Sequence, residues 1–255
     1  MSHPAFTKFS LFISCVLIFT SCVNTKKAIY FDSVQDTTFK AIGANMQPVI
    51  QQNDQLSIFV SSLNTGATEI FNTQNIQSNN NQRGSGYLVD TDGNIQFPIL
   101  GLTAASGLTK KELSNKIAKQ LTDKKLLIDP IVDIHILNFK VTVLGEVARP
   151  TVVPVTNEKI TILEALGFAG DLTIYAKRDN VILIREENGN RIIKRINLNS
   201  TDILKSPYYY LKANDVLYAE PSKVKVQTSG RSAQIIPIIL GSLSLLAIIL
   251  DRALR

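Results

Sequence analysis

Apolar segments at both ends of the chain limit any globular core to the residues between them. The first 21 residues hold a single lysine, Lys8, which is followed by the uncharged run FSLFISCVLIFTS. A short basic region before such an apolar run is typical of a secretory signal peptide rather than a membrane span. At the other end, residues 235–250 form a run of 16 residues without charge. The folded part of the chain is therefore expected between these two segments.

The end of the first apolar segment predicts a lipid anchor. Cys22 follows the residues FTS, an arrangement similar to the lipobox at which bacterial lipoproteins are acylated and cleaved. We predict a lipoprotein signal peptide over 1–21, lipidation of Cys22 and a polar tether over 22–45. The alternative is an ordinary signal peptide with a chance cysteine. Because Cys15 is removed with the signal peptide, an acylated mature chain has no disulfide, and its fold depends on packing alone.

Three patterns describe the first part of the mature chain. In residues 54–62, DQLSIFVSS, apolar and polar residues alternate as in a half-buried strand. Residues 64–86 are rich in Asn and Gln, and we expect a polar loop that cannot form a core. Residues 86–101 are expected to form a hairpin, because Asp92-Gly93 supplies the positive φ angles that a two-residue turn needs.

Two helices are predicted from capping boxes, in which a threonine and a glutamate three residues later satisfy the first backbone amides of a helix. Thr109 and Glu112 begin the first helix, over 108–125, whose apolar residues recur at four-residue spacing. Thr161 and Glu164 begin a shorter helix, ILEALGFAG, which ends at a glycine.

The remaining sequence predicts strands. Residues 129–155 are β-rich, residues 180–198 indicate a hairpin around Asn188-Gly189, and residues 215–221 form a closing strand. From residue 140 onward the order is two strands, one helix, two strands, a loop and a strand. This order predicts an α+β fold with one helix packed on a mixed sheet.

The sequence offers no positive sign of catalysis or metal binding. It contains no phosphate-binding glycine loop, nucleophile elbow or dinucleotide fingerprint. His135 is the only histidine left after signal removal, whereas a zinc site needs three or four ligands. Asp129, Asp133 and Glu146 lie beside strand or turn signals that account for them. We therefore predict no catalytic, cofactor-binding or metal site, with an envelope carbohydrate-active enzyme as a remote alternative.

An aromatic cluster and the net charge are the remaining features that suggest ligands. Tyr208, Tyr209 and Tyr210 are candidates for glycan contact, because tyrosine rings stack on sugar rings. The alternative is that they pack at the edge of a sheet with their hydroxyls in water. The formal charge of +6 would suggest nucleic acid in a cytoplasmic protein. In an exported protein it suggests acidic glycans or anionic lipid headgroups instead.

The chain resembles the family of outer-membrane polysaccharide export lipoproteins. The resemblance runs from Pro48 to Pro221 and is carried by these stretches: YLVDTDGNIQFPILG, GLTKKEL, DPIVDIHILNFKVTVLGEVARP, ITILEALGFAGDLTIYAKRDNVILIRE and SPYYYLKANDVLYAEP. It implies a polysaccharide export domain over 46–139 and a soluble-ligand-binding β-grasp (SLBB) domain over 140–221. This chain departs from the best-known members because it has room for one β-grasp domain rather than several. Family members form rings, and this difference leaves the height and subunit number of such a ring open.

The resemblance also implies a function. Family members assemble as homo-oligomeric rings, an octamer being one candidate, that carry capsular or exopolysaccharide through the periplasm and outer membrane. They meet an inner-membrane co-polymerase that is often a tyrosine autokinase. For this chain we expect a lipid-anchored outer-membrane protein whose domains are mainly periplasmic, with no enzyme activity, no cofactor and no nucleic-acid partner. The alternative is a periplasmic glycan-binding or scaffold lipoprotein anchored by its tail.

The C-terminal tail is predicted to be a transmembrane helix over 232–250. Its 19 uncharged residues would extend about 28 Å at ~1.5 Å per residue, close to the ~30 Å hydrocarbon core. Gly241, Ser244 and Ala247 recur at three-residue spacing, and small residues let neighbouring helices approach closely. The alternatives are a simple tail anchor or a segment buried against a domain.

Overall fold

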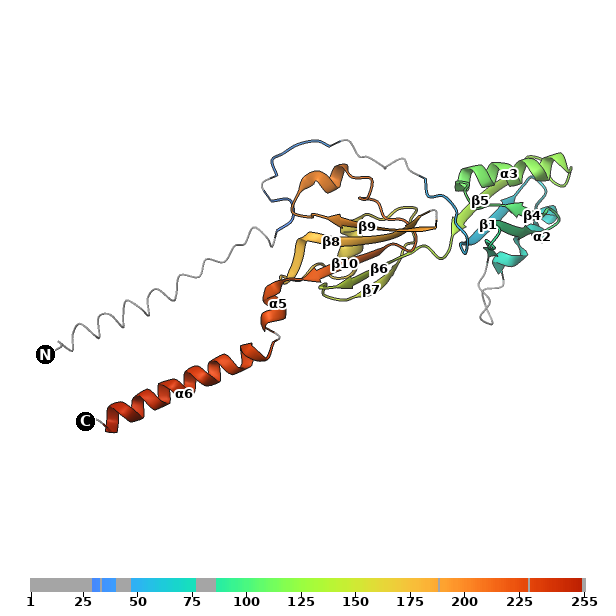
Figure 1. Cartoon of the computed structure of the whole chain (residues 1–255). Coiled ribbons are helices and arrows are strands. Elements are labelled where there is room, and N and C mark those ends of the chain that lie inside the picture. The colour runs from blue at the N-terminus through green and yellow to red at the C-terminus, as the bar shows by residue number, and fades with distance from the viewer. Residues whose placement is uncertain are drawn as a thin grey trace.

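Two hydrophobic cores organise the residues between the chain ends. The computed structural model describes residues 29–32, 34–39, 47–76, 86–187, 189–228 and 230–253. The first core is built from residues 50–134 and defines an N-terminal domain, and the second is built from residues 139–219 and defines a C-terminal domain. Two helices follow the C-terminal domain and leave it on the side away from the N-terminal domain (Figure 1).

The N-terminal domain contains a small antiparallel sheet. β1 (Gln55–Ser61) lies at its centre and pairs with β2 (Tyr87–Leu88) and β5 (Ile131–Ile136). The inward side chains of β1 are fully buried: Leu56, Ile58 and Val60. The predicted strand is therefore confirmed, and alternation placed the correct residues in the core.

Helix α3 (Lys110–Asp123) packs on β5. It begins after Thr109, whose hydroxyl accepts a hydrogen bond from the Glu112 amide at 3.2 Å. The Glu112 carboxylate in turn accepts one from the Thr109 amide at 2.8 Å. The residues that α3 buries are the predicted ones: Leu113, Ile117 and Leu121. Both the helix and its capping box are confirmed.

The Asn- and Gln-rich region contains a helix that the sequence pattern did not predict. α2 spans Thr65–Ile76, so the expectation of a polar loop is wrong for these residues. Phe71 is buried and stacks on Phe97, with 5.9 Å between the ring centroids. The Asn72 side chain forms hydrogen bonds with both backbone groups of Val60, each at 2.8 Å. These tertiary contacts stabilise a segment whose own composition does not favour a helix.

The hairpin predicted over 86–101 forms between other strands than expected, one strand further along the chain. The hairpin forms between β3 (Asn94–Phe97) and β4 (Gly101–Ala104), while β2 pairs with β1. Tyr87 explains this pairing, because its ring is buried in the first core and its hydroxyl donates a 2.9 Å hydrogen bond to the Phe71 carbonyl. The predicted pairing of strands is therefore wrong.

The turn at Asp92-Gly93 is nevertheless present. Gly93 has φ +81°. The Asp90 carboxylate accepts hydrogen bonds from the amides of Asp92 and Asn94 at 2.9 and 2.7 Å. This side chain closes the turn in the way that aspartate favours.

The C-terminal domain is a five-stranded mixed sheet with one helix on it. Its strand order is β7-β6-β10-β8-β9, in which β6 and β10 are parallel and the other pairs antiparallel. The elements are β6 (Lys140–Gly145), β7 (Thr151–Pro154), α4 (Ile162–Phe168), β8 (Ala176–Glu187), β9 (Asn190–Ile196), η3 (Thr201–Lys205) and β10 (Val216–Pro221). The predicted order of elements and the α+β class are confirmed.

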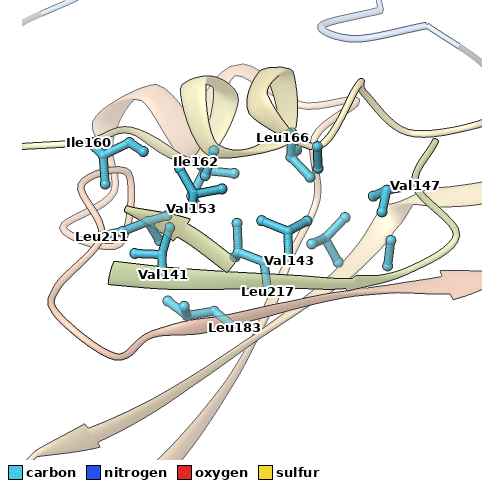
Figure 2. Close-up of a cluster of buried hydrophobic side chains, with 14 of the residues drawn as sticks. Val141, Val143, Val147, Val153, Ile160, Ile162, Leu166, Leu183, Leu211 and Leu217 are labelled. Atoms are coloured by element: carbon cyan, nitrogen blue, oxygen red, sulfur yellow. The ribbon is translucent and has the colours of Figure 1, made fainter. Parts of the chain in front are cut away.

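The second core lies between α4 and the sheet (Figure 2). Ile162 and Leu166 point from α4 toward Val141 and Val143 on β6, and all four are buried. The second predicted capping box is also present at the start of α4. At the end of β6, Gly145 has φ +91°, and a Cβ there would lie 2.1 Å from the Ala219 carbonyl oxygen. Only glycine allows β6 and β10 to approach so closely.

The tail forms two helices, α5 (Lys223–Thr228) and α6 (Arg231–Ala253). The large apolar side chains described on α6 are exposed, as illustrated by Ile238 at 70% and Ile248 at 67%. None of the helices searched among the described residues is long and apolar enough to cross a membrane. The prediction over 232–250 is therefore correct for a helix, but its assignment as a transmembrane span is not supported.

The described part of the predicted tether lies against the C-terminal domain. Tyr30 and Phe31 pack on the second core. The Phe31 amide donates a 3.1 Å hydrogen bond to the Leu198 carbonyl. This segment precedes the N-terminal domain in sequence, yet in space it contacts the domain that follows.

Candidate functional site

The three tyrosines lie in the loop between η3 and β10, and backbone hydrogen bonds tie this loop to α4. The Ile162 amide donates to the Tyr209 carbonyl at 3.0 Å, and Tyr210 forms an isolated bridge with Thr161. The first contact satisfies the Ile162 amide, which has no partner within the helix, and the Leu211 amide donates to the Ile160 carbonyl at 2.9 Å. The loop is therefore held at the N-terminal end of α4.

A buried ion pair contacts the same loop from the side of the sheet. Arg185 on β8 donates to the Asp215 carboxylate through Nε at 2.9 Å and through Nη2 at 2.6 Å. Both side chains are almost completely buried. Arg185 Nη2 also donates to the Tyr210 carbonyl at 3.2 Å, and the Lys212 amide donates to Asp215 at 2.7 Å. The pair thus links the central strands to the tyrosine loop through charge-assisted hydrogen bonds.

The three tyrosine rings have different surroundings. Tyr208 and Tyr209 are half-buried and pack against the second core. The Tyr208 ring lies 5.5 Å from the charged groups of both Arg185 and Lys194, within the range of cation–π attraction. Tyr210 meets Tyr209 edge to face at 5.3 Å and lines a groove. Tyr208 and Tyr209 thus lie against the second core and Tyr210 lines the groove, and contact of the three tyrosines with a glycan stays a prediction.

The groove lies between the two domains and has both apolar and polar walls. Val49 and Ile136 come from the N-terminal domain, and Tyr210, Lys159 and Lys212 come from the C-terminal domain. Its volume is about 130 Å³, whereas small-molecule pockets usually occupy ~300–1,000 Å³. The groove can therefore contact one part of a larger molecule but cannot enclose it.

Two charged residues that line the groove, Glu158 and Lys212, form ion pairs. Lys110 of α3 forms an ion pair and hydrogen bond with Glu158, which joins the two domains. The hydrogen bond from Lys110, together with its charge, lowers the pKa of Glu158 below its ordinary value. Lys212 similarly donates to Glu187 at 2.7 Å and lowers its pKa. Deeper in the groove, burial raises the pKa of Asp54, opposed by a hydrogen bond from the Gln51 amide.

The other candidate residues do not form a reactive cluster. His135 is exposed on β5, with Nε2 at 3.0 Å from an Asp133 carboxylate oxygen. Glu146 accepts a hydrogen bond from the Thr173 hydroxyl at 2.7 Å and lies in the other domain. Within the described ranges, no group of three or more His, Cys, Asp or Glu side chains could hold a metal ion.

The predicted lipid and tail residues stand apart from this site. Cys22 lies outside the described residues, and nothing is described of the Ala247 side chain. Gly241 and Ser244 lie on the exposed surface of α6, where the Ser244 hydroxyl donates to the Gly241 carbonyl at 2.8 Å. Their predicted role in helix packing stays a prediction.

The sequence pattern did not identify the groove or the Arg185–Asp215 pair. One signal was available, since a charged residue at a core-facing position of an apolar strand requires a buried partner. The partner lies 30 residues along the chain, so its identity needed the fold.

The domain composition agrees with this architecture. Residues 43–137 match the family described as Polysaccharide biosynthesis/export protein, and residues 140–195 match the SLBB domain family. The chain therefore contains a polysaccharide export domain followed by an SLBB domain, as the sequence resemblance indicated.

Two curated proteins are similar to part of this chain. The EPS I polysaccharide export outer membrane protein EpsA of Ralstonia nicotianae is 34% identical over 91 residues, which cover 34% of this chain and 23% of that protein. The protein of the same name from Ralstonia solanacearum is 32% identical over 92 residues, covering 35% of this chain and 24% of its own length. The match thus spans about a quarter of each relative. The chain is a distant homologue of these polysaccharide export outer membrane proteins.

Proposed function

We propose that this protein is a non-enzymatic, acylated component of an outer-membrane pathway that exports capsular or exopolysaccharide. The observation that carries the proposal is the succession of an export domain and an SLBB domain in one chain. The naming of both relatives as polysaccharide export outer membrane proteins supports it further. Copies of the chain would close into a ring around the polysaccharide, and an inner-membrane co-polymerase, such as a tyrosine autokinase, would deliver the polymer.

Two features support an assembly larger than one chain. The large apolar side chains described on α6 are exposed in the single chain, and leaving such area in water is unfavourable by about 25 cal/mol per Å². In addition, the groove between the domains is too small to enclose a polymer by itself. A closed homo-oligomer would cover the apolar side chains of α6. It would also surround the polysaccharide without a deep pocket in each subunit.

Native mass spectrometry of the full-length protein in detergent tests the ring. We expect one closed oligomer, with the octamer as one candidate, because symmetric closure limits the number of subunits. A monomer, together with normal surface polysaccharide in the strain that supplied it, would contradict the conduit. That result would favour the second candidate function, a periplasmic glycan-binding or scaffold lipoprotein, which Tyr210 and the polar rim of the groove would suit.

Lipidation of Cys22 is a separate prediction. Cells grown with a fatty-acid analogue should label the wild-type protein and leave Cys22→Ala unlabelled, because the acyl chains attach through this thiol. Cys15→Ala is the matched control, since Cys15 lies within the predicted signal peptide, and its label should equal that of the wild type. Equal labelling of Cys22→Ala and wild type would exclude the lipoprotein assignment.

A further inference from the structure

The segment from Tyr30 to Phe39 is docked on the C-terminal domain through specific contacts. The Tyr30 hydroxyl donates a hydrogen bond to the Asp171 carboxylate, and the Tyr30 ring lies 5.5 Å from the guanidinium carbon of Arg178. The Phe31 amide is bonded to the Leu198 carbonyl. At the end of the segment, the Lys205 ammonium lies 4.5 Å from the centre of the Phe39 ring. These contacts come from three separate parts of the C-terminal domain.

Hydrogen bonds within residues 171–178 hold the side chains that receive the segment. Arg178 is only 5% exposed, and its two terminal nitrogens donate to the Thr173 and Leu172 carbonyls at 3.2 and 3.1 Å. Its Nε has no hydrogen-bond partner among the residues that the structure describes. A buried guanidinium with an unused donor gains from a π face above it, which the Tyr30 ring supplies. Asp171 has φ +71° and accepts a 2.6 Å hydrogen bond from the Leu172 amide, which fixes its carboxylate.

Residues near Asp171 and Arg178 also contact the start of the C-terminal helices. The Ser222 amide donates to the Tyr175 carbonyl at 2.7 Å, just before α5. On α5, the Lys225 ammonium lies 5.0 Å from the Tyr175 ring centre and 3.6 Å from a Glu146 carboxylate oxygen. Glu146 accepts the Thr173 hydroxyl at 2.7 Å. Residues 171–178 therefore contact the N-terminal segment on one side and α5 on the other.

We propose that residues 171–178 form a clamp that binds the N-terminal segment and the root of the C-terminal helices of one chain together. Because Thr173 contacts both Arg178 and Glu146, a change in one attachment alters the surroundings of the other. Each attachment then stabilises the other, and thermodynamic linkage makes this effect equal in both directions. The clamp makes residues 30–32 and 34–39 a part of the C-terminal domain, and it holds the two segments that flank the folded domains at one place. This proposal does not depend on the exported substrate.

Hydrogen exchange of the full-length protein tests the clamp. Tyr30→Phe removes the hydrogen bond to Asp171 and keeps the ring, so amides in 29–39 should exchange about tenfold faster, as expected for loss of a hydrogen bond to a charged group. The decisive expectation is that amides of α5 also exchange at least about fivefold faster. Glu146→Gln removes the ion pair with Lys225 of α5 and keeps an acceptor oxygen for the Thr173 hydroxyl, and it should in turn loosen 29–39. Tyr218→Phe, on exposed β10 surface, is the matched control and should change neither.

The results separate the clamp from independent contacts. Faster exchange confined to 29–39 in Tyr30→Phe, and to α5 in Glu146→Gln, would overturn the proposal. Amides of β6 and β8 provide the folding reference, and Lys225→Ala replaces Glu146→Gln if that variant loses protection there. A thiol cross-linker between Asp32→Cys and Asn199→Cys, which line one groove, should give a product of monomer mass. A ladder of covalent oligomers would mean that the segment docks on a neighbouring copy and would also overturn the single-chain clamp.

Alkaline pH provides a second arm of the same test. Burial, followed by the hydrogen bond to Asp171, raises the pKa of Tyr30 above its ordinary value of about 10. The docked segment thus favours the neutral phenol. Its contribution should be complete below pH ~10 and should decline as pH rises above that value. The difference in thermal stability between wild type and Tyr30→Phe should therefore shrink above pH ~10, as the Tyr30 phenol loses its proton in the unfolded chain. The charged groups that face this hydroxyl and its ring are Asp171 and Arg178. A difference that stays constant up to pH ~11 would contradict the docked hydroxyl.

Discussion

Replacing Arg185 with alanine is expected to lower the free energy of unfolding of the C-terminal domain by about 3–5 kcal/mol. Asp215 is 1% exposed and would lose its three hydrogen bonds from the guanidinium. Its carboxylate would remain buried beside the Lys212 amide alone, and an unpaired buried charge is strongly unfavourable. The Tyr210 carbonyl would also lose its contact, so the tyrosine loop should become more mobile. Urea denaturation, followed by a signal from the C-terminal domain, measures the change.

Two further variants test whether the decrease in the free energy of unfolding comes from the buried ion pair. Arg191→Ala is the matched control, because Arg191 and Glu186 are both about 70% exposed and 3.8 Å apart, and exposed pairs contribute less than about 1 kcal/mol. The double variant Arg185→Met with Asp215→Leu should regain most of the lost stability, since apolar replacement of a whole buried pair is often neutral. If Arg185→Ala were no more destabilising than Arg191→Ala, the pair would not support the loop.

Truncation after Gly230 is expected to abolish surface polysaccharide while leaving both domains folded. Both hydrophobic cores end before α5, and none of the residues of α5 is buried. The unfolding temperature of each domain should therefore change by less than about 2 °C. The loss of export would follow from the removal of α6, whose exposed apolar side chains we expect to be covered in the assembled protein. Staining of surface polysaccharide in a deletion strain that expresses the truncated chain measures the effect.

A substitution that keeps α6 controls for damage to expression. Arg252→Ala retains the helix and its apolar side chains, and it should support export at the wild-type level. Both proteins should carry the same fatty-acid label, because neither change reaches Cys22. Normal export by the truncated chain would show that α6 is only an attachment, and it would remove α6 from the proposed assembly.

Local sequence patterns were sufficient for most of the secondary structure. The capping boxes at Thr109 and Thr161 predicted the starts of α3 and α4, since each depends on side chains within one helical turn. The alternation in β1 predicted which side chains are buried. The turn at Asn188-Gly189 predicted the β8–β9 hairpin, whose strands lie next to each other in sequence.

The patterns failed where a distant residue decides the outcome. α2 forms in an Asn- and Gln-rich stretch because Phe71 reaches Phe97 and Asn72 reaches the backbone of β1. β2 leaves the predicted hairpin because the buried Tyr87 binds the carbonyl of Phe71. Local composition favoured another structure in both places, and tertiary contacts outweighed a weak intrinsic preference.

The sequence alone was enough for the α+β class, the family resemblance, and the expectation that the folded core lies between two apolar ends, because these depend on periodicity, spacing and the order of motifs. Only the tertiary structure brought together Arg185 and Asp215, placed Tyr210 in a groove between the domains, and docked Tyr30 on Asp171 and Arg178. Tyr30 and Asp171 are separated by 141 positions and by an entire domain. A hydrogen bond across such a distance leaves no periodic trace in the sequence, because the fold of the C-terminal domain, not the spacing along the chain, brings its partners together.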